Sequence, residues 1–384
     1  MAFYTTQGTI PKKRHTQMRQ ANGQLYTEEL FGREGFSGRQ SLLYHITPPT
    51  KVEAVRDLGP VVREFTVGGP LLHRHLQTMK VETKEKDAVE GRTMLLGNAD
   101  VAFGVAVVTE PMTYFYRSAE GDELLFVHTG SGVVETIFGH LDYHAGDYII
   151  LPVGTTYRVV PTVGEETRLV VIEAQGAITA PKHYVNDAGQ MMEHAPYCER
   201  DLRLPRLETH DERGDFEVRV RARKHVTSYS LSYHPFDVVG WDGALYPYIF
   251  NIDDFEPITG RIHQPPPVHQ TFAGPNFVIC SFVPRKLDYH PLSIPVPYHH
   301  SNIESDEVIY YVDGQFMSRK GIEVGSVTVH PGGIAHGPQP GVVEKSLGAM
   351  ETAELAVMMD TFHPLGLSAA ACSVEDPHYM YSWR

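Results

Sequence analysis

A spacing pattern that occurs twice limits the folds open to this chain of 384 residues. In each copy a glutamate, Glu123 or Glu307, is followed by six residues, most of them apolar or aromatic, and then by a glycine. Each copy continues with a glycine, five residues, a Pro-x-Gly turn and two further residues, and it ends at Tyr157 or His336. Short β-rich runs between such turn residues are typical of antiparallel β-structure. The repetition therefore predicts an internal duplication of one β-domain.

The second copy carries side chains that can bind a metal. His300 precedes Glu307, and His336 closes the copy. Two imidazoles and one carboxylate can hold a non-haem iron(II) and leave coordination positions open for O2 and a substrate, although the same ligands can hold other metals. Small barrels bring such ligands together by pointing alternate strand residues inward. His299 and His300 are adjacent, so only one of them can face inward; we predict His300, with His299 as the alternative.

The first copy has the same spacing without the ligands. Arg117 stands near the place where a histidine would be expected, and Tyr157 replaces the last histidine. A guanidinium group cannot lose its proton to bind a metal. We therefore predict a first barrel that binds no metal and acts as a scaffold. His73 and His75 form an H-x-H pair, but no carboxylate follows at the required spacing. We interpret this pair as the polar face of a strand.

Composition excludes several classes of partner and location. The chain is 42% hydrophobic and 21% charged, with a formal net charge of −14, which argues against nucleic acid or an anionic membrane as its main partner. Its three cysteines are far apart and form no disulfide framework, so a reducing compartment is expected. The N-terminus lacks a signal-peptide pattern, and no apolar run approaches the ~20 residues that span a bilayer. We predict a cytoplasmic protein.

The two half-motifs match the cupin signature, and further residues resemble the homogentisate 1,2-dioxygenase family. They are the run PFDVVGWDG from Pro235, the stretch from Tyr298 to Glu307, and the segment from His330 to His336 with the Gly-Pro that follows. We therefore predict a mainly β protein of two tandem cupin (jelly-roll barrel) domains. The N-terminal domain, without metal, is expected at 1–180, a connecting segment at 181–234, and the Fe(II)-binding catalytic domain at 235–384.

The resemblance implies roles for single residues. The iron ligands of the family fall on His300, Glu307 and His336, and the last of these is also expected to contact substrate. The general base of the family, a histidine in an H-x-x-P loop, falls on His263. His330 matches a second active-site histidine, which we expect to orient the substrate or to stabilise a developing oxyanion.

One position departs from the family. A tyrosine that contacts substrate stands nine residues after the glutamate in the family, and this chain has Phe316 there. Tyr311 or Tyr310 could supply the missing hydroxyl, and we include Tyr311 and Phe316 among the expected substrate contacts.

The resemblance implies an extradiol-type dioxygenase that converts homogentisate and O2 to maleylacetoacetate in tyrosine and phenylalanine catabolism. It also implies a homo-oligomer, a trimer or a hexamer. The departure at Phe316 keeps open a different 2,5-dihydroxy aromatic substrate such as gentisate. A non-enzymatic two-barrel binding protein is the third alternative, against which the intact ligand set of the second copy argues.

Overall fold

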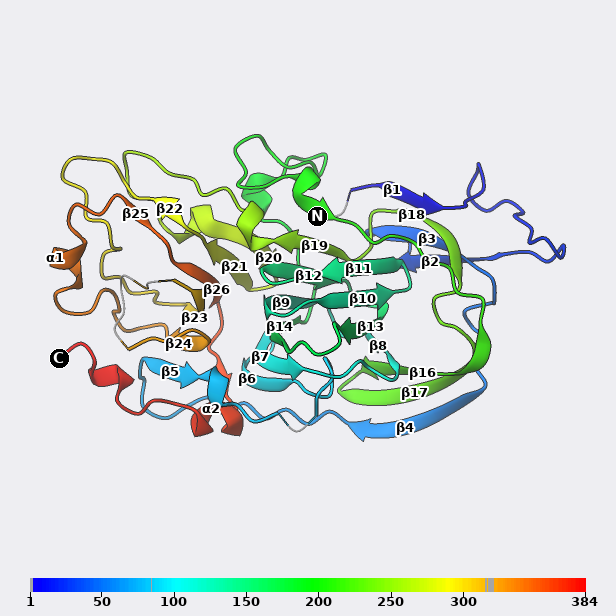
Figure 1. Ribbon diagram of the computed structural model, residues 1–384, viewed down its shortest axis with the longest axis horizontal. Helices are drawn as coiled ribbons and strands as arrows, with labels where there is room; N and C mark the ends of the chain where they lie inside the picture. The colour runs from blue at the N-terminus through cyan, green and yellow to red at the C-terminus, as the bar shows by residue number, and fades with distance from the viewer. Residues whose placement is uncertain (1–2, 84, 315, 317–320) are drawn as a thin grey trace.

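The computed structural model describes residues 3–83, 85–314, 316 and 321–384, and β-strands make up most of its regular structure. Two β-rich halves lie side by side along the long axis of the molecule (Figure 1). The predicted fold class, mainly β with two tandem cupin-type domains, is confirmed. The two α-helices of the described residues, Val342–Ser346 (α1) and Ala369–Ser373 (α2), are short. No helix in this part of the chain is long and apolar enough to cross a bilayer.

The N-terminal half contains an eight-stranded and a seven-stranded sheet. The order in the first is β15 (Leu202–Arg203), β19 (Tyr248–Asn251), β12 (Asp147–Leu151), β9 (Glu123–Thr129), β14 (Thr167–Ala174), β7 (Val101–Val108), β6 (Thr93–Gly97) and β27 (Gly366–Leu367). The order in the second is β11 (Gly139–Tyr143), β10 (Gly132–Thr136), β13 (Thr156–Pro161), β8 (Phe115–Ser118), β16 (Arg213–Ala222), β17 (His225–Tyr233) and β4 (Ala54–Pro60). Leu125 and Val171 of the first sheet pack with Val134 and Val159 of the second in one buried core.

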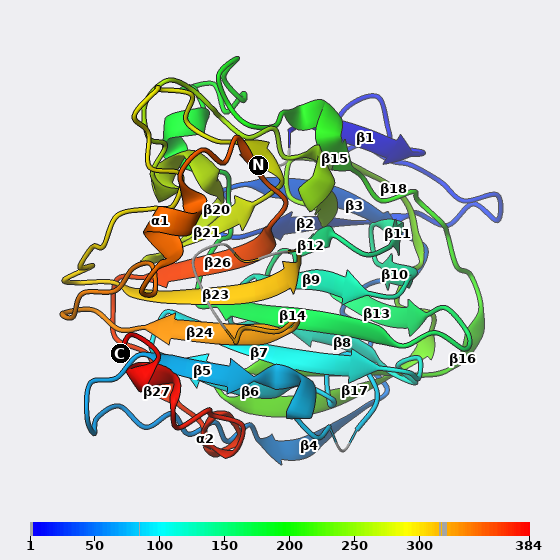
Figure 2. The same cartoon turned by 60° about the vertical axis from the view of Figure 1, so that its left-hand side comes forward.

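The C-terminal half is built on a six-stranded sheet, whose strands β26, β23, β24 and β5 lie next to one another in Figure 2. Its order is β20 (Gln270–Gly274), β21 (Phe277–Phe282), β26 (Leu355–Thr361), β23 (Asp306–Asp313), β24 (Ser326–His330) and β5 (Arg74–Gln77). One face of this sheet packs against the outer face of the eight-stranded sheet: Val308 and Met359 share a buried core with Phe126 and Val170. The opposite face of the six-stranded sheet does not take part in this core and is available for a binding site.

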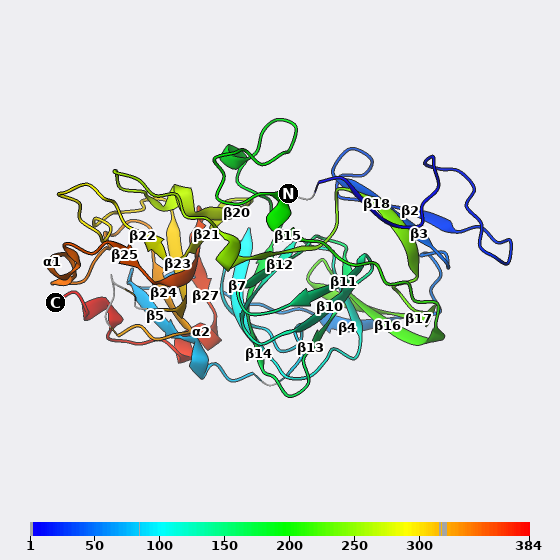
Figure 3. The same ribbon diagram turned by 45° about the horizontal axis from the view of Figure 1, so that its top comes forward.

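Smaller elements complete the fold. A four-stranded sheet, β1 (Thr5–Gly8), β18 (Val238–Gly243), β3 (Gln40–His45) and β2 (Thr27–Gly32), lies at the end of the molecule far from the C-terminal half (Figure 3). A two-stranded ribbon joins β22 (Arg285–Lys286) to β25 (Glu351–Thr352). The 3-10 helices are Thr78–Lys80, Lys182–Tyr184, Glu199–Asp201, Ile252–Asp254, Pro266–His269 and Tyr379–Tyr381.

The sheets cross the boundaries predicted from the sequence. Strands β16 and β17 lie within the expected connecting segment 181–234, yet they belong to the seven-stranded sheet. Strand β19, from the expected catalytic range 235–384, pairs with β12, and β5, from the expected N-terminal range 1–180, pairs with β24. Strands join where a buried face and an open sheet edge match, so neighbours in a sheet need not be neighbours in the chain.

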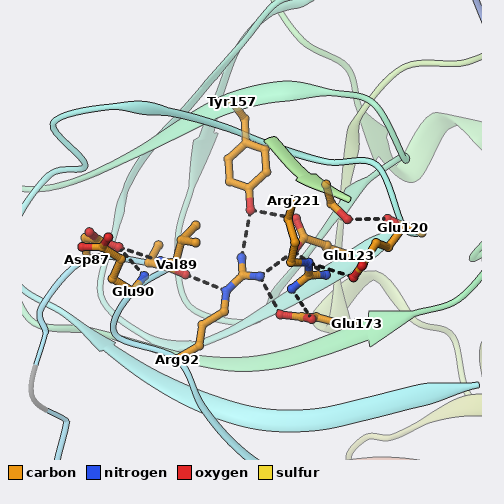
Figure 4. A network of polar contacts seen from close by, with 12 residues as sticks. Asp87, Val89, Glu90, Arg92, Glu120, Glu123, Tyr157, Glu173 and Arg221 are labelled. Atoms are coloured by element: carbon orange, nitrogen blue, oxygen red, sulfur yellow. Dashed lines mark hydrogen bonds and ion pairs between the residues drawn. The ribbon is translucent and has the colours of Figure 1, made fainter. Parts of the chain in front are cut away.

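A buried ionic cluster occupies the first barrel where its spacing pattern would place metal ligands (Figure 4). Arg92 donates to Tyr157 Oη at 2.8 Å and to Glu173 Oε1 at 2.9 Å, and it also pairs with Glu123. Tyr157 donates to Glu123 Oε2 at 2.8 Å. The two residues at the ligand positions of the pattern, Glu123 and Tyr157, are thus bonded to a permanent cation.

Glu173 is the anion that three arginines of this cluster share. Besides Arg92 it binds Arg221, at 2.6 Å, and Arg63. Burial alone would raise the pKa of Glu173, but the guanidinium groups of Arg221, Arg63 and Arg92 lower it well below its usual value. The carboxylate therefore stays charged, and it compensates the positive charge of the guanidinium groups around it.

Glu173→Gln should destabilise the protein by about 3 kcal/mol, because it removes the negative charge of a buried carboxylate that Arg63, Arg92 and Arg221 share. Glu166→Gln is the matched control: its carboxylate is 53% exposed and lies 3.3 Å from Arg168, and exposed pairs contribute only about 0–1 kcal/mol. Chemical denaturation of both variants measures the difference. Equal losses of stability would show that the cluster is no more important than a surface ion pair.

Candidate metal centre

Strand alternation directs one set of side chains of the six-stranded sheet into a cavity. On β23, Val308 and Tyr310 enter the core between the halves, while Glu307 and Ile309 face the other side. The same alternation on β26 directs Met358 to the cavity. The cavity has a volume of about 610 Å³, and residues of the proline-rich loops at 258–267 and 294–298 also line it.

His300 and Glu307 line this cavity, and the buried His336 converges with them. His300 Nε2 lies 3.8 Å from Glu307 Oε2, and His336 Nε2 lies 3.4 Å from Glu307 Oε1. One ligand atom from each residue lies within 4.8 Å of the other two. The backbones of His300 and His336 exchange two hydrogen bonds of 2.9 Å, which fix the two histidines beside each other. His299 is directed elsewhere: its Nε2 lies 3.2 Å from the carbonyl oxygen of Pro338.

The donor set fits a divalent transition metal. Burial alone would raise the pKa of Glu307, but the neighbouring imidazoles of His300, His330 and His336 lower it well below its usual value, so the carboxylate carries its charge. Both ring nitrogens of His336 are buried and make no hydrogen bond within the described part of the chain. Buried polar atoms are seldom left without a partner, and a metal bound by one of these nitrogens would provide one.

His330 lies behind Glu307 rather than in the cavity. Its Nδ1 donates to Glu307 Oε1 at 2.7 Å, and its Nε2 lies 3.2 Å from the hydroxyl of Tyr379. The ring is fully buried and stacks on His336 with centroids 4.6 Å apart. The predicted contact of His330 with substrate does not agree with this placement, because the side chain is enclosed between Glu307 and the C-terminal segment. Its geometry is that of a group that orients the carboxylate.

His73 packs against His330 and His336. This contact was not predicted from the sequence. Its ring centroid lies 5.3 Å from that of His330 and 5.8 Å from that of His336, and its Nε2 is 3.0 Å from the carbonyl oxygen of Ala335. His75, two residues on, lies 2.8 Å from Ser326 Oγ. The H-x-H pair was the available signal. Its buried position beside β24 differs from the polar strand face that the spacing suggested.

The other predicted residues lie around the cavity. His263 lines it from the loop, with its ring centroid 5.0 Å from that of Tyr298. Burial, with Arg285 nearby, lowers the pKa of His263 despite the opposing effect of Asp288. Phe316 and Tyr311 also line the cavity, and their ring centroids are 4.5 Å apart.

Of the two tyrosines considered as substitutes for the missing hydroxyl, only Tyr311 reaches the cavity. Its hydroxyl lies 3.1 Å from Thr328 Oγ1. The hydroxyl of Tyr310 points the other way and lies 2.6 Å from His128 Nδ1, in the core between the two halves.

Two further cavity residues, Asp360 and His269, were not among the predicted site residues. Asp360 on β26 is the cross-strand partner of Glu307, and burial together with that carboxylate raises its pKa well above the usual range. His269 ends the 3-10 helix Pro266–His269, and burial with the neighbouring Arg285 lowers its pKa to about 3. Asp360 follows an apolar run, so nothing in the sequence beside it indicated a site.

Comparison with known proteins identifies the family. Residues 3–252 match the family model described as homogentisate 1,2-dioxygenase, N-terminal. This chain belongs to the homogentisate 1,2-dioxygenase family. The homogentisate 1,2-dioxygenase of Bradyrhizobium diazoefficiens is 25% identical over 98% of this chain and 90% of its own length. The enzyme of the same name from Mus musculus is 25% identical over 94% of this chain and 88% of its own.

A relative that is more similar to this chain carries a less specific name. It is "Putative dioxygenase SSO1533" of Saccharolobus solfataricus, 42% identical over the whole of this chain and 99% of its own length. Among solved structures, a cupin 2 conserved barrel domain protein from Leptotrichia buccalis covers 75% of this chain and 95% of its own, with 11% identity and a TM-score of 0.35. That likeness is too distant to argue from.

His300→Gln should lower metal affinity at least tenfold, because it removes one of three ligands, whereas His299→Gln should leave metal content unchanged. The pair is a matched control, since the two histidines are adjacent and only one reaches Glu307. Metal analysis after loading with Fe(II) under anaerobic conditions measures both variants. Loss of metal from His299→Gln with retention in His300→Gln would reverse the assignment.

Proposed function

We propose that this protein is an Fe(II)-dependent, extradiol-type ring-cleaving dioxygenase that converts homogentisate and O2 to maleylacetoacetate. The observation that carries the proposal is the cluster of His300, Glu307 and His336 at a cavity of about 610 Å³ in a chain of this family. Two imidazoles and one carboxylate leave coordination positions open, as a reaction of O2 with a bound substrate requires. Such a reaction would serve tyrosine and phenylalanine catabolism.

His300, Glu307 and His336 would hold ferrous iron, which would supply the electron-transfer chemistry between the aromatic substrate and O2. The cavity supports the aromatic ring with apolar and aromatic side chains, which include Ile309, Met358 and Phe316. Enclosing the ring in this way also keeps stray water from the reacting groups.

His263 is the proposed acceptor of the phenol proton. It lines the cavity from the loop at 258–267, near Tyr298, which in turn approaches His300. Because its pKa is lowered, the imidazole is neutral at neutral pH and can accept a proton. A histidine near its titration range is an effective general base.

His330 acts in this scheme by positioning a ligand. Its hydrogen bond to Glu307 fixes the orientation of the carboxylate, and Tyr379 holds the other ring nitrogen. Outer partners of this kind typically change metal affinity or activity by about 10–100-fold when they are removed. The expected direct contact of His330 with substrate is therefore not part of the proposal.

Gentisate is the second candidate substrate, and Phe316 is the observation that favours it. The side chain at this cavity position offers no hydroxyl to the substrate, and Tyr311 beside it already has Thr328 within hydrogen-bonding distance. The homo-oligomeric state, trimer or hexamer, and the cytoplasmic location remain predictions from the sequence.

Protein loaded with Fe(II) without oxygen, then mixed with homogentisate and O2, should consume O2 and release the ring-opened product. Oxygen uptake and absorbance of the product measure the reaction, and gentisate is run in parallel. Faster turnover of gentisate would replace the substrate, while absence of both metal binding and turnover would favour a binding protein.

His263→Gln should lower kcat by about 10²–10⁴-fold, the usual contribution of a positioned general base. In the wild type, kcat/KM should be level near neutral pH and fall in acid, below the ordinary histidine pKa of about 6.5, as His263 becomes protonated. The exposed His290 on a nearby loop is the control, and His290→Gln should keep both the rate and the acid limb. An unchanged pH profile in His263→Gln would exclude it as the base.

A further inference from the structure

Asp360 is a cavity carboxyl that the proposed mechanism does not use. It lines the cavity, and its Oδ1 is buried with no hydrogen-bond partner among the described residues. The other acidic residues of the lining have evident roles: Glu307 belongs to the metal cluster, Glu354 binds Arg285 at 2.9 Å, and Asp288 accepts a hydrogen bond from the backbone of His290.

The position of Asp360 across the sheet from Glu307 is unfavourable for the stability of the fold. Glu307 on β23 has two cross-strand partners: His330 on β24 and Asp360 on β26. His330 donates a hydrogen bond to the carboxylate, but Asp360 presents a second acidic group on the same face. Like charges directly across a sheet destabilise it, and a buried polar group without a partner adds a cost of about 1–3 kcal/mol.

Asp360 does not complete the ligand set. The cluster whose ligand atoms approach one another within 4.8 Å contains His300, Glu307 and His336, and within the described ranges it does not extend to Asp360. The carboxyl therefore lies on the cavity wall beside the metal cluster, where it can contact a bound substrate.

A carboxyl oxygen can accept a hydrogen bond whether or not the group is protonated. The surrounding wall is mostly apolar, with Met358 and Ala356 on the same face of β26. Ser305, two residues before Glu307, also lines the cavity with a buried hydroxyl that has no partner in the described part of the chain. A ligand that carries hydroxyl groups, which both donate and accept hydrogen bonds, could satisfy these atoms.

We propose that Asp360 binds a hydroxyl group of the aromatic substrate and fixes the ring beside the metal cluster. The inference rests on the proposed function, since it takes a dihydroxylated aromatic acid as the ligand. It makes Asp360 a specificity-determining residue: a ring that lacks this hydroxyl leaves the carboxyl without a partner and binds less well.

The test compares three ligands on Fe(II)-loaded protein without O2: homogentisate, 2-hydroxyphenylacetate and 3-hydroxyphenylacetate, each of the last two lacking one hydroxyl. Wild type should bind homogentisate at least about tenfold more tightly than one of the two analogues, the effect of a hydrogen bond to a buried carboxyl. In Asp360→Ala that ratio should fall to within about twofold of one, a range set by the same hydrogen bond. The analogue that responds identifies the hydroxyl.

Asp360→Leu is a second variant, whose side chain has a shape similar to that of aspartate. It therefore fills the space that Asp360→Ala would leave empty. It replaces an uncompensated buried carboxyl by an apolar group, so it should fold at least as well as wild type and lose the same discrimination. Met358→Ala is the control on the same face of β26, and it should weaken all three ligands alike.

A ratio that stays unchanged in both Asp360 variants, in protein that still turns over homogentisate as wild type, would overturn this inference and leave the proposed function intact. Wild type that binds Fe(II) but neither binds nor turns over homogentisate would overturn both.

Discussion

The carboxylate of Glu307 is buried and charged, and much of the C-terminal half is arranged around that fact. A charge removed from water requires compensation. Here three imidazoles surround it: that of His300 on the cavity side, and the buried rings of His336 and His330. Strands β23 and β24, which carry Glu307 and His330, are held from the other face by the core between the two halves. Rigid packing there allows a charged centre on the opposite face.

The two copies of the spacing pattern solve the same electrostatic problem in different ways. Each places a buried glutamate at the start of a strand, Glu123 in β9 and Glu307 in β23. In the first copy Arg92 provides a permanent positive charge and Tyr157 a hydroxyl. In the second copy histidines leave room for a metal ion to supply the charge. A guanidinium group carries only hydrogen-bond donors and offers no position for a metal ion, which is the chemical difference between the two copies.

The sequence predicted those parts of the site that depend on local spacing. His300, Glu307 and His336 could be identified because a glycine, a proline turn and alternation along a strand fix where they point. The neighbours of Glu307 across the sheet could not be identified in this way. His330 and Asp360 are neighbours of Glu307 through strand pairing. The register of such a pairing cannot be read from the residues of either strand alone. The expected substrate contact of His330 and the neglect of Asp360 and His73 share this cause.

The edge strand β5 comes from far upstream in the chain, yet it closes the sheet that carries the metal cluster. Without it, β24 would present an unpaired edge, and such edges recruit other chains. His73, just before this strand, would also be missing from behind His330 and His336. A fragment that holds only the ligand-bearing part of the chain therefore lacks one of its own structural components. During synthesis β5 leaves the ribosome early, and it cannot pair with β24 until the last third of the polypeptide has emerged.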